Sequence, residues 1–233
     1  EGHDAEQCFL RAAFCVLLRY DALGGHGYQA ALGEASFDVL LAQMNCQQEC
    51  FASPFNCRYE RFCSAFEDVD GPFGSVGSFF SPNFAPTRGC YEANPPFVPD
   101  LMESMATKMD SLLESASLGL TFIVIVPAWT TLTFWKSLVS SRWLRAPLLE
   151  IPATEHGFCD GAQHQRKPSE RHRPSSFNTG VFILQNDLAF QKSTASSSTR
   201  LLDILSHLRN AMSKAKGNLE DISSYEHRVR RGG

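Results

Sequence analysis

Apolar residues along this chain fall alternately into strand-like runs and helix-like spacings. Residues 120–126 read Leu-Thr-Phe-Ile-Val-Ile-Val, a nearly continuous apolar run that is typical of a strand buried on both faces of a parallel sheet. Shorter runs predict strands at 49–52, 89–93, 148–152 and 181–186. Apolar residues spaced three and four apart predict helices at 8–20, at 36–44 with Ser36 as the N-cap, at 99–113 and at 200–212. The alternation predicts an α/β fold with a mostly parallel, doubly wound sheet.

Length and composition limit the chain to one sizeable core. With 233 residues, 43% of them hydrophobic, we expect a catalytic domain over 1–190, in which 1–20 could end a preceding helical region. Residues 191–233 are expected to hold a Ser-rich linker, one helix and a disordered basic tail. The chain opens on acidic residues without Met, so we expect a fragment. No apolar run is long enough for a bilayer, so no membrane contact is expected.

The chemistry is concentrated in Asn94-Pro95-Pro96-Phe97, which follows the strand at 89–93. Two consecutive prolines fix the backbone and aim the neighbouring carbonyls. The Asn94 side-chain oxygen and the Pro95 carbonyl could accept both hydrogens of an exocyclic amine such as adenine N6, and Phe97 could stack on the base. A Pro-rich loop with a core phenylalanine is the alternative, and the tetrapeptide alone favours neither.

A second candidate loop follows the strand at 49–52. Ser53 and Asn56 could receive the amino-acid end of a cofactor, and Asn56 is expected to cap a short helix containing Tyr59 and Phe62. Asp68 and Asp70 come about 20 residues after the start of that strand, where nucleotide-binding folds place the acid that holds a ribose. A solvated acidic turn is an equally good interpretation. Gly74 is expected to let the backbone approach a ligand.

Three other signals are weaker. Gly25-x-Gly27-x-x-Ala30 resembles a dinucleotide fingerprint but follows a predicted helix, which favours an ordinary glycine loop. The eight cysteines include no Cys-x-x-Cys pair, so we favour buried, reduced thiols over disulfides or zinc and expect no metal site. The net charge of -4 gives no general reason for nucleic-acid binding, but the basic segment 163–173, which contains Arg166 and Lys167, could contact phosphates.

Several strings occur here in one order and together resemble the catalytic domain of the phosphorylated-CTD-interacting-factor family, the cap-specific adenosine N6-methyltransferases. The likeness covers roughly residues 18–187 and rests on these strings: Glu49-Cys50-Phe51-Ala52-Ser53-Pro54-x-Asn56, Asp70-Gly71-x-Phe73-Gly74-Ser75, Phe84-Ala85-Pro86, Glu92-Ala93-Asn94-Pro95-Pro96-Phe97, Glu155-His156 and Asn178-Thr179-x-Val181-x-x-Leu184-Gln185-Asn186-Asp187.

The resemblance implies a Rossmann-like, S-adenosylmethionine-dependent domain that methylates N6 of the first transcribed adenosine beside the 7-methylguanosine cap of mRNA. Asn94, Pro95, Pro96 and Phe97 would hold the amine and the base. Trp129, Glu155 and His156 would lie near the capped substrate, with Arg166 and Lys167 from the basic segment. The residues expected to bind the cofactor are Phe51, Ala52, Ser53, Pro54, Asn56, Asp70, Phe73 and Gly74.

The same resemblance implies a nuclear protein whose wider family contacts RNA polymerase II through a WW domain. We expect that domain and the family's cap-gripping helical domain to lie outside this chain. The chain also departs from the family pattern at Thr130-Thr131-Leu132 after Trp129 and around Pro99-Asp100, which bears on cap specificity. Methylation of DNA adenine, methylation of a glutamine amide in protein, and a non-catalytic RNA-binding scaffold that keeps the fold are the alternatives.

Overall fold

The computed structural model describes residues 2–23, 29–194 and 200–216. The glycine-rich stretch at 24–28 and the basic residues from 217 onward lie outside these residues. The helices are α1 Gly2–Ala22, α2 Glu34–Met44, α3 Glu67–Asp70, α4 Pro99–Ser115, α5 Thr133–Val139, α6 Asp187–Thr194 and α7 Arg200–Lys214. The strands are β1 Gln48–Glu49, β2 Arg61–Phe62, β3 Gly89–Ala93, β4 Leu120–Pro127, β5 Leu149–Ile151, β6 Gly157–Cys159, β7 His172–Pro174 and β8 Thr179–Gln185.

One mixed sheet organises the molecule, with the strand order β2-β1-β3-β4-β8-β5. β1 pairs in parallel with both β2 and β3, and β3 pairs in parallel with β4. β8 alone runs antiparallel, between β4 and β5. The predicted α/β fold with a mostly parallel central sheet is confirmed. The short hairpin β6–β7 forms a separate two-stranded sheet.

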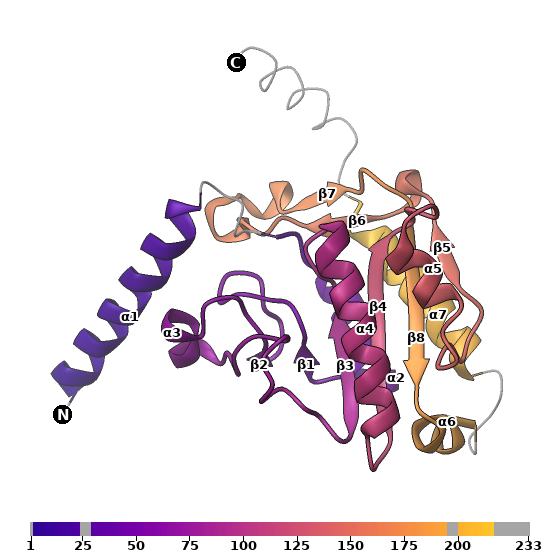
Figure 1. Ribbon diagram of the computed structural model, residues 1–233. Coiled ribbons are helices and arrows are strands. Elements are labelled where there is room, and N and C mark those ends of the chain that lie inside the picture. The colour runs from indigo at the N-terminus through magenta and orange to yellow at the C-terminus, as the bar shows by residue number, and fades with distance from the viewer. Residues whose placement is uncertain (1, 24–28, 195–199, 217–233) are drawn as a thin grey trace.

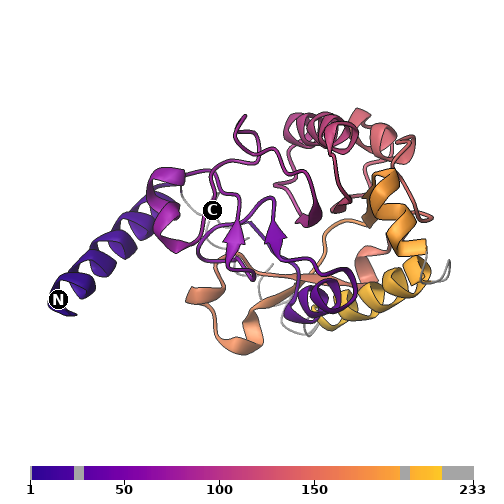
Figure 2. The same cartoon turned by 90° about the horizontal axis from the view of Figure 1, so that it is seen from below.

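Helices cover both faces of the central sheet, as the edge-on view in Figure 2 shows. β4 shows this arrangement, because its successive residues point to opposite faces of the sheet and pack in two separate hydrophobic clusters. Phe122, Val124 and Val126 pack with α4 and α5, whereas Ile123 and Ile125 pack with α2 and α7. All eight residues of β4 are buried. The apolar run at 120–126 is therefore a central strand covered on both sides.

Two predicted local structures are wrong. α2 begins at Glu34 with Gly33 as its N-cap, and Ser36 is buried inside the first turn. No short helix contains Tyr59 and Phe62, because Arg61–Phe62 is strand β2. Asn56 cannot cap such a helix, since its Oδ1 turns back to accept hydrogen bonds from Ser53 N–H (2.7 Å) and the Ser53 hydroxyl (2.9 Å).

The first and last described helices differ in how they pack against the sheet. α7 lies beyond residue 190, where we expected the catalytic domain to end, yet Leu201, Ile204 and Leu208 belong to the core under the sheet. α1 instead projects away from the sheet (Figure 1). It is tied down near its end by an ion pair between Arg19 and Asp68 (2.8 Å) and by the buried Tyr20. No helix within residues 2–23, 29–194 and 200–216 is both long and apolar enough to cross a membrane.

Candidate active site

The site lies where the sheet changes its direction of winding. The chain places β2 on one side of β1 and β3 on the other, so the loops after β1 and β3 leave in opposite directions and open a crevice between them. Ligands of open α/β sheets bind at such switch points, outside the carboxyl ends of the strands. The predicted loop residues 53–56 and 94–97 lie there, although β1 ends at Glu49, so the first loop begins three residues earlier than predicted.

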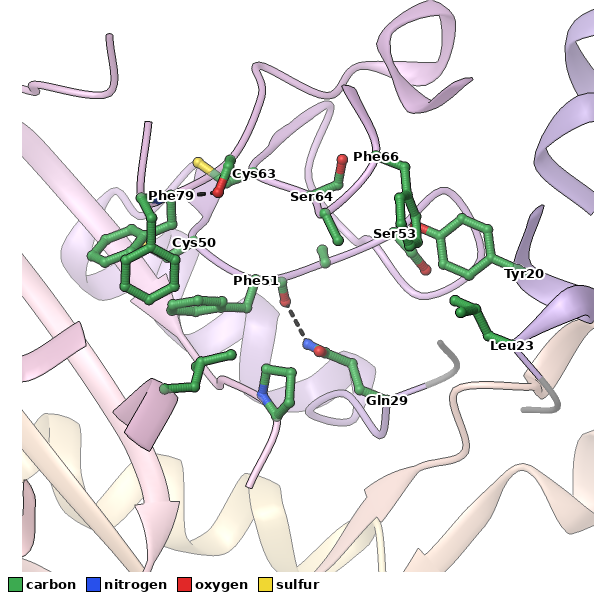
Figure 3. Close-up of a pocket in the computed structure, with 16 residues that line it drawn as sticks. Tyr20, Leu23, Gln29, Cys50, Phe51, Ser53, Cys63, Ser64, Phe66 and Phe79 are labelled. Carbon is green, nitrogen blue, oxygen red and sulfur yellow. Dashed lines mark hydrogen bonds between the residues drawn. The ribbon is translucent and has the colours of Figure 1, made fainter. Parts of the chain in front are cut away.

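A cavity of about 250 Å³ occupies this crevice and is referred to below as the strand-end cavity. Its walls come from the loops after β1, β2 and β3, with α1 and the start of α4 closing two sides (Figure 3). The lining residues are Tyr20, Leu23, Gln29, Cys50, Phe51, Ala52, Ser53, Cys63, Ser64, Ala65, Phe66, Ser78, Phe79, Phe80, Pro96 and Leu101. Most of the wall is apolar and aromatic, with a few hydroxyl and amide groups, which suits a small molecule with a flat ring and polar ends.

The structure brings only some of the predicted cofactor residues into this wall. Phe51, Ala52 and Ser53 line it, and the Phe51 ring packs on Phe79 with centroids 4.9 Å apart. Pro54, Asn56, Asp70, Phe73 and Gly74 do not line it.

Asn56 and Gly74 stabilise other parts of the fold. Asn56 holds the turn after β1 through Ser53 and donates from Nδ2 to the Gln29 carbonyl (3.0 Å). Gly74 has φ +106°, and a Cβ there would lie 2.2 Å from the Glu60 carbonyl oxygen. The close approach that we predicted at Gly74 is therefore to the protein's own backbone.

Asp70 lies behind the cavity wall. It is fully buried, and its carboxylate accepts a hydrogen bond from the Tyr20 hydroxyl at 2.8 Å. Burial raises the pKa of Asp70, while hydrogen bonds from Ser64 and Tyr20 oppose the rise. Asp68 is exposed and bonded to Arg19, so only Asp68 fits the solvated turn that was the alternative. Tyr20 and Ser64 stand in the lining in front of Asp70.

Asn94 is the most informative residue of the site. It follows β3, is 4% exposed, and donates from Nδ2 to the Ala30 carbonyl at 2.8 Å. That bond fixes which way the amide points, because a carbonyl oxygen can only accept. Asn94 Oδ1 is buried and has no hydrogen-bond donor among the described residues. An orphaned buried acceptor costs about 1–3 kcal/mol, so a donor that reached Asn94 Oδ1 would stabilise this arrangement.

Phe97 begins a row of aromatic side chains that leads away from Asn94. Its ring is half-buried, 6.4 Å from Trp129 and 6.2 Å from Phe158, and Trp129 lies 5.3 Å from Phe177. Phe97 and Trp129 are therefore neighbours in the structure. Phe177, which is 42% exposed, was missed because nothing in its local sequence distinguishes it from a loop residue.

The Glu155-His156 pair does not reach the strand-end cavity. His156 is fully buried, and burial lowers its pKa, so the ring is neutral. The partners fix the tautomer: Nδ1 donates to the Pro152 carbonyl and Nε2 accepts from the Thr179 hydroxyl, both at 2.8 Å. Glu155 pairs with Arg209 of α7 at 2.5 Å. Both side chains therefore bond to other residues of the chain, His156 in the interior and Glu155 at the surface.

The basic segment lies beside the loop after β1. Gln163 donates from Nε2 to the Phe55 carbonyl (3.1 Å), and the His164 ring stacks on Phe55 with centroids 4.5 Å apart. Arg166 pairs with Asp160 at 3.2 Å, whereas Lys167 is exposed. Part of the positive charge is thus neutralised within the chain.

Most of the cysteines are buried free thiols and do not form a metal-ligand cluster within the described residues. Cys46, Cys50, Cys63, Cys90 and Cys159 are buried free thiols, but Cys8 and Cys15 are exposed on α1, so the prediction of burial is wrong for those two. Within the described residues, no group of three or more His, Cys, Asp or Glu side chains could hold a metal ion.

A buried pair of carboxyl groups lies directly below the site. Glu49 of β1 and Glu92 of β3 are register partners on adjacent parallel strands, and they are 2% and 1% exposed. Burial raises the pKa of Glu49 to about 7, although N–H groups of Tyr59 and Arg58 donate to its carboxylate. Burial, followed by the charge of Glu49, raises the pKa of Glu92 well above its usual range.

This pair predicts a stability that falls with pH. A carboxyl group with a raised pKa binds more protons folded than unfolded, so its contribution is complete below about pH 4.3 and is lost as pH rises through the folded pKa, near 7 for Glu49. We expect Glu92→Gln to gain stability over the wild type as pH rises from 4.5 to 7.5 in urea unfolding. The exposed Glu60→Gln should follow the wild type, and a constant difference for Glu92→Gln would contradict the shifted pKa.

Comparison with known proteins places the chain in a family. The family model described as phosphorylated CTD interacting factor 1 WW domain matches residues 1–161, which here form the elements from α1 to β6. Two curated proteins named mRNA (2'-O-methyladenosine-N(6)-)-methyltransferase, from Homo sapiens and Mus musculus, are each 40% identical over 192 residues. The match covers 79% of this chain and 27% of each relative. The chain thus spans about a quarter of their length, and it belongs to the phosphorylated CTD interacting factor 1 family.

Proposed function

We propose that this domain transfers a methyl group from S-adenosylmethionine to adenosine N6 beside the cap of mRNA. One observation carries the proposal: Asn94 Oδ1 is a buried acceptor with no donor among the described residues, its amide is fixed by the bond to the Ala30 carbonyl, and Pro96 of the same turn lines the strand-end cavity. An exocyclic amine has hydrogens to donate to such an acceptor. The names of the two curated relatives support adenosine N6 as the amine.

The lining of the strand-end cavity supports S-adenosylmethionine as the cofactor. Phe51, Phe66 and Phe79 supply flat apolar walls for the adenine ring, and Ser53 and Ser64 supply polar groups for the ribose and the amino-acid end. The strand order, with crossovers to both sides of β1, supports a Rossmann-like methyltransferase fold. S-adenosylmethionine, when bound, supplies the electrophilic methyl group.

The chain's own contribution is alignment. Asn94 Oδ1 and the Pro95 carbonyl accept the amine hydrogens, which aims the nitrogen lone pair at the cavity. Pro95 and Pro96 restrict the backbone that carries these acceptors, so the turn loses little conformational entropy when the amine binds. Phe97 and Trp129 stack against the base and the adjoining nucleotide, at about 1–3 kcal/mol per stacked base. No side chain has to act as a nucleophile.

The remaining substrate contacts are proposed from the basic segment. Lys167 is exposed, and Arg166 lies beside it, next to the loop after β1, so both could meet RNA phosphates. Glu155 and His156 could act on the capped end only through the loop that they hold in place. A nuclear location and a polymerase contact through regions outside this chain rest on the family alone.

A substrate comparison tests the proposal. The purified chain is incubated with labelled S-adenosylmethionine and one of four acceptors: RNA capped and beginning with 2′-O-methyladenosine, the same RNA uncapped, adenine-containing DNA, or a glutamine-containing peptide. We expect label at N6 of the first adenosine of the capped RNA. Transfer only to DNA or peptide would overturn the substrate assignment, and cofactor binding without transfer to any acceptor would indicate the scaffold.

A further inference from the structure

Gln29 connects the two loops on which methyl transfer would depend. Its Nε2 donates to the Phe51 carbonyl at 2.8 Å and to the Asn94 carbonyl at 3.2 Å. Phe51 belongs to the cavity wall after β1, and Asn94 opens the turn after β3. Figure 3 shows the Gln29 amide pointing toward the Phe51 carbonyl. One side chain thus spans the gap between the proposed cofactor side and the proposed amine side.

The neighbouring backbone extends this connection. The Gln29 carbonyl accepts from Asn56 Nδ2 at 3.0 Å, and the next carbonyl, of Ala30, accepts from Asn94 Nδ2 at 2.8 Å. Ala31 then exchanges both backbone hydrogen bonds with Cys159 of β6, at 3.0 and 2.7 Å. The segment 29–31 is therefore fixed to the hairpin on one side and to both active loops on the other.

We infer that Gln29 is a positioning residue, which sets the distance between the cofactor loop and the amine-holding turn and so aligns the acceptor amine with the methyl group. The inference rests on the proposed function. Two donors on one planar amide nitrogen, both satisfied by carbonyl oxygens of different loops, leave Gln29 little freedom. Alignment of reacting atoms is sensitive to such placement, because a displacement of about 1 Å can cost roughly 10²-fold in rate.

Two substitutions separate positioning from other roles. Gln29→Leu removes the donors, and we expect kcat to fall about 10–100-fold while the Kd for S-adenosylmethionine, measured by calorimetry, and the KM for capped RNA change less than about 3-fold. Gln29→Glu keeps the size but places a carboxylate opposite two carbonyls. Its protonated form regains a donor, so its kcat relative to the wild type should recover as pH falls, whereas that of Gln29→Leu should stay flat.

Gln47→Leu is the matched control, because Gln47 is exposed and bonds only the Asn45 side chain near the protein surface in the described contacts (2.9 Å). It should leave kcat, KM and Kd unchanged. A raised Kd with unchanged kcat in Gln29→Leu would make Gln29 a cofactor contact and overturn the inference, as would a lower melting temperature with normal kcat. An inactive wild type would overturn the proposed function together with the inference. An active wild type whose kcat is unchanged by Gln29→Leu would overturn the inference alone.

Discussion

Asn94→Ala should remove methyl transfer and leave the protein folded. The variant loses the buried side-chain oxygen that we propose as the acceptor for the amine, so we expect kcat to fall about 10²–10³-fold, the usual cost of removing one preorganised polar group from a reacting centre. Stability should change little. The hydrogen bond to Ala30 is lost, at about 1 kcal/mol, but the orphaned Oδ1 is removed with it.

The measurement is single-turnover methyl transfer with saturating cofactor, together with thermal unfolding. Asn83→Ala is the matched control, because Asn83 is exposed on the loop before β3. It should retain the wild-type rate. Full activity in a folded Asn94→Ala protein would refute the role given to Oδ1.

Gly74→Ala should destabilise the fold by roughly 2–6 kcal/mol, combining about 1–3 for an L-residue at positive φ and about 1–3 for steric overlap. The φ of +106° and the 2.2 Å approach of a Cβ to the Glu60 carbonyl oxygen are the causes. The effect should reach the cavity, because Gly74 accepts from Phe62 N–H at 3.4 Å beside the end of β2.

Gly71→Ala supplies the comparison for this prediction. Gly71 has φ −50°, and a Cβ there meets no atom within 4 Å. Its free energy of unfolding should stay within about 0.5 kcal/mol of the wild type or rise slightly. Equal stability of the two variants in urea would contradict the close approach at Gly74.

The sequence predicted those parts of the structure that local chemistry decides. The apolar run at 120–126 could only be a strand covered on both faces, and Pro99 after two prolines marked the start of α4. The rigid turn at 94–97 was predicted from its prolines and lies at the carboxyl end of β3, where it was expected. Each of these follows from residues close together in the chain.

The remainder depended on contacts between distant segments. Tyr20 covers Asp70 across 50 positions, and Gln29 reaches Asn94 across 65, so neither pairing is visible in a local pattern. His156 has the residue type of a catalytic group, but Thr179 satisfies its second nitrogen, and only the folded chain shows this. Asn56 likewise has the composition of a helix cap and instead holds a turn.

Binding of S-adenosylmethionine is the most direct test of the whole account. Calorimetric titration of the wild-type chain should show saturable binding at one site, with the same affinity in Asn94→Ala, because Asn94 Oδ1 is assigned to the acceptor amine and not to the cofactor. Absence of binding by a folded wild type would contradict the assignment of the strand-end cavity and, with it, the proposed methyl transfer.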